Sequence, residues 1–150
     1  MNEAVVAGAL VAAALNAAPA LLGGWRWYRG ESSPVFWVLL RIAQAGAVVF
    51  AFAVGVLAAA GRSSTESLFY LYALLPLAVA FVAEQLRLAS AQTILDQRGL
   101  ESAQEVGRLP ADEQRAVVAA IVRREQGIMA LSVLVAVFLL LRAAGTAHGI

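Results

Sequence analysis

Several polar side chains lie inside long apolar stretches of this chain, where they could do chemistry. Asn16, Arg41, Gln44 and Glu84 each lie within a segment that is otherwise almost free of charge, and Arg87 follows Glu84 by about one helical turn. A carboxylate and a guanidinium in apolar surroundings can form an ion pair. They can also bind a substrate or carry a proton, because ionisable groups in membrane helices often mark such paths.

The elements that must position these side chains are membrane helices. Apolar residues make up 61% of the 150 residues and charged residues 14%, against roughly 45–50% and about 25% in ordinary soluble domains. Charge-free windows of about 19 residues are typical of membrane spans. We therefore predict an all-α fold: a polytopic integral membrane protein that forms a four-transmembrane-helix bundle in one domain over residues 1–150. The spans are expected at about 4–22, 35–60, 68–88 and 128–144.

The hairpin of the second and third spans brings the polar side chains to one level. Folding this hairpin about its short connection near Ser63 leaves Arg41 and Glu84 almost equally far from the turn. Asn16 in the first span should lie at a similar depth, and Gln44 slightly deeper. We therefore predict a polar intramembrane layer built from three helices.

Two interpretations of this layer stay open. An unpaired charge in lipid costs roughly 2.5–3.5 kcal/mol on insertion scales. Pairing Arg41 with Glu84, or snorkelling of both side chains to the membrane boundary, relieves that cost. We favour this structural interpretation, with Gln44 and Asn16 as hydrogen-bonding partners between helices. The functional alternative is a substrate or proton site in the same layer.

Small residues recur at every fourth position of the second span. Residues of this size at this spacing allow another helix to approach closely. The pattern predicts a helix-packing ridge and favours association with a second copy or with another membrane protein. The ridge consists of Ala43, Ala47, Ala51, Gly55 and Ala59.

The third span continues beyond the membrane boundary as a helix. Gly99 is placed as its C-cap, with a contact between Leu95 and Leu100 across the cap. A new helix begins at Pro110 and leads into the fourth span, either as one long helix or with a bend at Gly127. Residues of about 89–127 thus form a cytoplasmic helical hairpin. Within it Glu125 falls on an apolar arc, so we expect it to pair with Arg87.

Arginine and aromatic residues alternate in the first connection, which we place at Gly23–Pro34. This pattern is typical of an interfacial belt, with aromatic rings at headgroup level and arginines on anionic lipid. We expect such contacts at Arg26, Arg29, Arg123 and Arg124. A net charge of +1 with no basic stripe argues against nucleic acid as a partner.

The distribution of arginine also predicts the orientation. Arginines concentrate in the first and third connections, so these should be cytoplasmic and both termini outside. No positively charged segment precedes the first span, so we expect the span to be retained rather than cleaved as a signal peptide.

Several classes of chemistry are absent. The chain has no Lys and no Cys, and His148 is its only histidine. This excludes a Walker A motif, a Schiff-base lysine, thiolate catalysis and cysteine metal sites. A bis-histidine haem and a histidine metal cluster are excluded as well. We therefore assign no catalytic, cofactor-binding or metal-binding residues. The acidic side chains of the third connection are interpreted as a solvated face, namely Glu101, Glu105, Asp112 and Glu113.

These observations favour a non-enzymatic accessory or interaction subunit of an assembly in the bacterial cytoplasmic (inner) membrane. The alternative is a small oligomeric transporter or channel in which the Arg41–Glu84 layer lines the path. An enzyme acting on lipid or quinone is a third and weaker interpretation. The absence of catalytic groups and the long charged third connection support the first function, whereas only the polar layer and Pro76 in mid-span support the second.

Overall fold

The computed structural model describes residues 2–147, which form helices and no strand. The all-α prediction is therefore confirmed over this range, and four of the helices are long and apolar enough to cross a membrane. The helices are α1 (Asn2–Tyr28), α2 (Pro34–Ala59), α3 (Ser67–Leu88), α4 (Ser90–Gln97), α5 (Ala103–Val106) and α6 (Ala111–Thr146).

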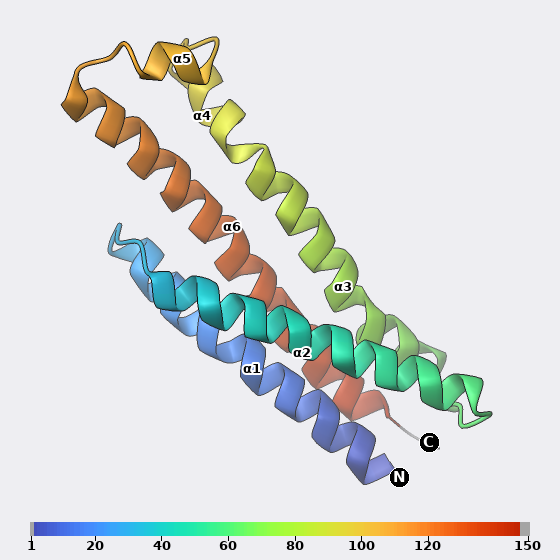
Figure 1. The fold of residues 1–150 in the computed structure, drawn as a ribbon. Coiled ribbons are helices and arrows are strands. Elements are labelled where there is room, and N and C mark those ends of the chain that lie inside the picture. Colours follow the sequence, from blue (N-terminus) through green and yellow to red (C-terminus); the bar gives the residue numbers. More distant parts are fainter. Residues whose placement is uncertain (1, 148–150) are drawn as a thin grey trace.

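The long helix α6 is the axis of the arrangement (Figure 1). Both α1 and α3 pack extensively against α6, whereas α2 rests mainly on α1 and contacts α3 much less. The two chain ends and the α2–α3 connection lie at one end of the molecule (Figure 1). At the other end α6 extends beyond α1 and α2, and there it lies beside α4 and α5 (Figure 1). We call this part, residues 89–122, the distal arm.

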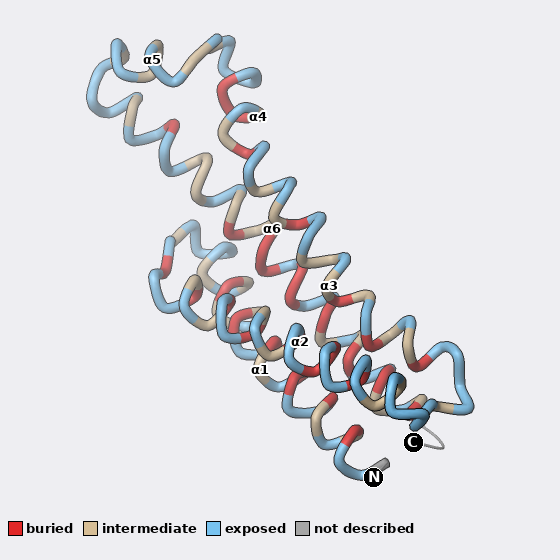
Figure 2. Tube along the Cα trace, turned by 45° about the vertical axis from the view of Figure 1, so that its right-hand side comes forward, coloured by how far each residue is buried: buried red, intermediate tan, exposed pale blue. Residues whose placement is uncertain are grey.

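Buried residues of α6 are sparse in its first turns, where Val117 is buried, and recur regularly from Gln126 onward (Figure 2). One apolar cluster near the chain ends includes Ala9, Phe50, Phe69 and Leu140. A second cluster, around Phe36, lies where α2, α3 and α6 meet below the α1–α2 connection. The third cluster belongs to the distal arm alone. It consists of Ile94, Leu95 and Val117, with Leu100, Val106, Leu109, Ala120 and Ile121 packed against them.

Two predicted helix boundaries are present in the structure. Pro34 is the first residue of α2, and the Ser33 hydroxyl accepts a hydrogen bond from the Phe36 amide at 3.4 Å. Gly99 has φ +68°, and the Leu100 amide donates to the Leu95 carbonyl at 2.9 Å. This hydrogen bond closes α4 across a left-handed glycine that directly follows the C-cap residue Arg98. The expected helix end at Gly99 is therefore confirmed, with the C-cap itself one position earlier.

The predicted end of the first helix was wrong. We expected a connection from Gly23 onward, but α1 continues to Tyr28. Gly23 is buried, and the Phe36 ring occupies the space that a Cβ would need. The glycine therefore serves close packing instead of breaking the helix, and tertiary contact overrides its weak helix propensity. The chain leaves the helix at Gly30, whose φ is +70°.

Two further boundaries were settled by the structure. The expected continuous extension of the third span is interrupted at Ala89, which separates α3 from α4. The lead-in to the fourth span is one helix, because α6 runs unbroken from Ala111 to Thr146. Gly127 lies inside α6, where the Trp27 indole lies against its open face.

The small-residue ridge of α2 is only partly used within the chain. Ala43, Ala47 and Ala51 are buried, whereas Gly55 and Ala59 are exposed. A spacing of four residues advances about 40° beyond a full turn at each step, because an α-helix has 3.6 residues per turn. The ridge therefore turns away from the buried face of α2 towards the C-terminal end of this helix. Phe50 and Val54 continue the buried face there.

Gly23 and Gly24 provide a matched test of this packing. A Cβ on Gly23 would overlap the Phe36 ring, whereas a Cβ on Gly24 would meet nothing within 4 Å. We expect Gly23→Ala to lower the free energy of unfolding by about 1–3 kcal/mol through overpacking. Gly24→Ala should raise it by about 0.5–1 kcal/mol through helix propensity. Thermal unfolding of the two variants in one detergent measures both effects, and equal melting temperatures would contradict the proposed close approach.

Candidate functional site

The predicted charge pair is formed between α2 and α3. Arg41 lies seven residues after the start of α2, about 10 Å along the helix axis. Glu84 lies in the last turns of α3. The two side chains meet with Arg41 Nη1 2.6 Å from Glu84 Oε1. The antiparallel course of the hairpin thus brings together two residues that are 43 positions apart.

The Glu84 carboxylate accepts hydrogen bonds from three side chains. Oε1 accepts from Arg41 Nη1 and from Gln44 Nε2, the latter at 3.1 Å. Oε2 accepts from Arg87 Nε at 2.9 Å. Arg41 Nη1 also donates to Gln44 Oε1 at 2.7 Å, which closes the network on the α2 side. Both carboxylate oxygens are thereby engaged. We call these four residues the Glu84 clamp.

Arg87 connects the Glu84 clamp to α6. Its Nη1 lies 4.0 Å from Glu125 Oε2, so the expected partner of Glu125 is found. Its guanidinium carbon lies 5.7 Å from the centroid of the Trp37 ring, a cation–π distance. The two guanidinium groups of the network are balanced by the two carboxylates. The side chains of Glu84, Arg87 and Glu125 are each about one quarter exposed, whereas that of Arg41 is 54% exposed.

Asn16 does not join the Glu84 clamp. It is 2% exposed, and its Nδ2 donates to the Ala12 carbonyl at 2.9 Å and to the Ala43 carbonyl at 3.4 Å. The amide therefore links α1 to the backbone of α2. The predicted layer consequently has two parts, a charged network on α2 and α3 and a separate amide contact on α1.

A cavity of about 390 Å³ separates these two parts. The four long helices all contribute to its wall, and most of the lining is apolar. Besides the polar residues already described, Ser132 of α6 lines it, and its hydroxyl donates to the Met129 carbonyl at 2.8 Å. Ser132 was not among the residues predicted from the sequence, although it is a lone hydroxyl in the apolar run of the fourth span.

A second overlooked residue is Gln126 of α6. It is 1% exposed and lies more than 90 residues from its partners on α1 and the α1–α2 connection. The amide stands next to the anomalous Glu125 and just before the apolar fourth span, and this position was the available signal. Gln126 belongs to another cavity, at the junction of α1 and α6.

The arginines assigned to anionic lipid lie around that junction. Arg26 and Arg29 both form ion pairs with Glu31, at 2.5 and 3.1 Å. Arg123 stands over the Trp27 ring, with its guanidinium carbon 5.8 Å from the ring centroid. Arg124 lines an apolar cavity beside Trp27.

Acidic and histidine side chains form no candidate metal centre in the part of the chain that the structure describes. Glu105 of the acidic third connection instead accepts a hydrogen bond from the Glu101 amide at 2.8 Å. His148 lies outside the described residues. Comparisons of the chain with protein-family models, curated proteins and solved structures find no match. A functional conclusion therefore depends on the geometry above.

Removing members of the Glu84 clamp should have unequal effects. Glu84→Ala leaves Arg41 and Arg87 without their shared carboxylate, and we expect it to lower the free energy of unfolding by about 2–3 kcal/mol. Arg41→Ala leaves Glu84 bonded to Arg87 and Gln44, and should cost about 1 kcal/mol. Chemical unfolding in detergent micelles measures both values.

The double variant Arg41→Ala/Glu84→Ala completes the cycle and should lose less than the sum of the two single variants. Strictly additive losses would contradict a direct pair. Glu113→Ala is the matched control, since this exposed carboxylate on α6 has no ion pair within the described range. Its effect should stay within about 0.5 kcal/mol.

Proposed function

We propose that this chain is a multi-pass protein of the bacterial cytoplasmic membrane and acts as an accessory or interaction subunit. In this proposal the four long helices cross the bilayer, and the distal arm projects into the cytoplasm, where it meets a partner protein. The single observation that carries the proposal is the distal arm, because it extends past α1 and α2 and has an apolar core of its own.

Large exposed apolar side chains support insertion into a membrane. Val49, Phe52 and Phe81 are 67%, 72% and 67% exposed on the outer faces of α2 and α3. Contiguous apolar surface of this kind is unfavourable in water and favourable in lipid. Aromatic residues near the helix ends agree with two interfaces. Trp25, Trp27 and Trp37 lie towards the α1–α2 connection, while Tyr70 and Tyr72 lie towards the opposite end.

The Glu84 clamp supports a structural role for the charges in the spans. Both oxygens of Glu84 already accept hydrogen bonds from side chains. Binding of a proton or a substrate at Glu84 would weaken its hydrogen bonds to the two arginines, whereas the accessory function leaves them intact. Stable pairing of this kind holds the first turns of α2 against the last turns of α3, and the end of α3 leads into the distal arm.

A transporter or channel is the second candidate, and one observation favours it. The cavity of about 390 Å³ borders Glu84 and is lined by all four long helices. In an oligomer such cavities could join into a path. This function requires Glu84 to be reachable from bulk water, whereas the accessory function does not.

The arm proposal predicts position-dependent crosslinking to a partner. A photoreactive amino acid at Arg108 or Asp112 should yield one adduct of defined mass after irradiation of native membranes. The same amino acid at Ser63 or Glu66, in the opposite connection, is the matched control and should not yield it. Native mass spectrometry of the complex in nanodiscs should then give a fixed ratio of the two proteins. A pure homo-oligomer, with no arm adduct, would contradict the proposal and favour the transporter.

The proposed orientation predicts that both termini face outward. Alkaline phosphatase fused after Ile150 should be active in intact cells, because the enzyme matures only outside the cytoplasm. A fluorescent reporter that folds only in the cytoplasm should be dark at the same position. The matched fusion within the third connection, after Arg108, should give the opposite pair of readings. A bright reporter after Ile150 would overturn the orientation.

A further inference from the structure

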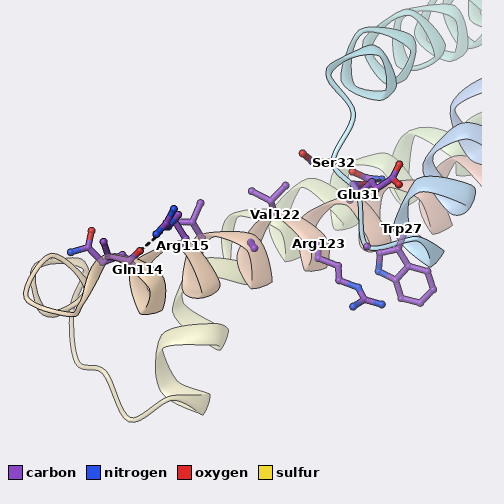
Figure 3. Close-up of a pocket in the computed structure, with 12 residues that line it drawn as sticks. Trp27, Glu31, Ser32, Gln114, Arg115, Val122 and Arg123 are labelled. Carbon is purple, nitrogen blue, oxygen red and sulfur yellow. Dashed lines mark hydrogen bonds between the residues drawn. The ribbon is translucent and has the colours of Figure 1, made fainter.

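A cavity of about 530 Å³ lies between the end of α1, the α1–α2 connection and α6 (Figure 3). Trp27, Glu31 and Ser32 line it from α1 and the α1–α2 connection, and Arg115 and Arg123 line it from α6, with Arg123 next to Trp27. Its volume is in the usual range for small-molecule sites, which span about 300–1,000 Å³. It belongs neither to the Glu84 clamp nor to the core of the distal arm.

Gln126 of α6 is one of the residues that line this cavity, and its amide group is buried. Its Nε2 donates to the carbonyls of Gly23 and Glu31, at 3.2 and 3.3 Å. Because both partners are acceptors, the amide nitrogen must face them, and the orientation of the group follows. Oε1 is then buried without a hydrogen-bond partner among residues 2–147. Oε1 has almost no accessible surface, so a molecule in the cavity does not reach it. The part that Gln126 plays is to hold α1 and the α1–α2 connection against α6 as the wall of the cavity.

The charged groups around the cavity select an anion. Arg123 has no carboxylate within ion-pair distance in the described chain, and its guanidinium lies beside Trp27. Arg115 Nε donates a hydrogen bond to the Ala111 carbonyl, and a neutral carbonyl does not balance the charge of the guanidinium. The nearby carboxylate of Glu31 is already paired with Arg26 and Arg29. The positive charges at the cavity that no carboxylate neutralises are therefore those of Arg115 and Arg123.

An apolar cavity of about 710 Å³ adjoins the first one. The two cavities share Trp27 and Arg123, and the second continues along α6 past Ile128, Leu131 and Leu134. Gly127 allows Trp27 to lie directly against α6 where the two cavities meet, since a Cβ there would lie 2.6 Å from Trp27 Nε1. A polar cationic cavity that opens into an apolar one matches a molecule with an anionic polar head and a long apolar tail.

We propose that the two cavities form a binding site for one anionic phospholipid, such as phosphatidylglycerol. The phosphate lies at Arg123, where the cavities meet. The headgroup occupies the polar cavity on the side of Arg115. An acyl chain occupies the apolar cavity. This site rests on the proposed membrane insertion.

The test uses the full chain in nanodiscs, with bound lipids counted by native mass spectrometry after release. In mixtures of equal amounts, phosphatidylglycerol should be retained at least about tenfold over phosphatidylcholine. Phosphatidylmethanol carries the same charge without a headgroup hydroxyl. It should be retained to within about twofold of phosphatidylglycerol, because the site binds the phosphate. Equal retention of all three lipids would overturn the site.

Substitutions locate the site on the protein. Arg123→Gln should reduce the retention of phosphatidylglycerol about tenfold. Arg108→Gln, which removes the same charge from the distal arm away from both cavities, should leave retention unchanged. Equal losses in the two variants would overturn a specific site in favour of general surface charge. Gly127→Ala should also reduce retention by displacing Trp27, with Gly145→Ala as its control on the same helix.

Two further arms separate the possible failures. Soluble glycerol phosphate, added to protein in nanodiscs made of phosphatidylcholine alone, should not bind at concentrations below millimolar, because it has no tail for the apolar cavity. Tight binding of this soluble compound would overturn the lipid assignment. A protein that elutes apart from the nanodiscs would overturn the proposed membrane insertion, and the lipid site with it. Incorporation without lipid selectivity would overturn the lipid site alone.

Discussion

The ion pair between Arg41 and Glu84 joins two helices that otherwise contact each other little. α2 packs mainly on α1, and α3 packs mainly on α6. An unpaired charge in apolar surroundings costs roughly 2.5–3.5 kcal/mol, so the two charges hold the hairpin in a single register. Because Glu84 also binds Arg87, and Arg87 approaches Glu125, the same carboxylate relates the position of α2 to that of α6.

Small residues make the rest of the packing possible. Ala9, Ala12 and Ala13 of α1 are almost fully buried, and Phe50 of α2 and Leu140 of α6 belong to the same cluster. Close approach of helix backbones increases dispersion contacts, and these are a main source of helix association in lipid. The glycines do the same at single points, as Gly23 does for the Phe36 ring.

The distal arm and the proposed lipid site lie on neighbouring parts of α6. The first turns of α6 support the apolar core of the arm through Val117, and the next turns carry Arg123 and Gln126. If a lipid binds at Arg123, it contacts the end of α1 and the base of the arm together. A bound lipid would therefore stabilise the junction between the long helices and the distal arm, and with it the position of the arm for which we propose a partner protein.

The sequence by itself determined the helical class, the four long apolar segments and several of their ends. These properties depend on local patterns, namely runs of apolar residues, the Ser33–Pro34 start and the helix end at Gly99. The pairing of Arg41 with Glu84 also followed, because a short connection and a helical rise fix which residues of a hairpin lie at one level. The expected contact of Glu125 with Arg87 followed from the need to pair a carboxylate on an apolar face.

Only the tertiary structure decided which neighbour each helix has. The extension of α1 through Gly23 depends on the Phe36 ring of the next helix. The burial of only three of the five residues of the α2 ridge depends on how α2 packs against its neighbours. Asn16 was expected in one layer with Glu84, but its amide nitrogen donates to the backbone carbonyls of Ala12 and Ala43 instead. The orientation of the Gln126 amide is fixed by two carbonyls 103 and 95 residues away, which accept hydrogen bonds from its nitrogen and leave its oxygen without a partner among the described residues. Such contacts depend on how whole helices pack, and local sequence patterns carry no information about that.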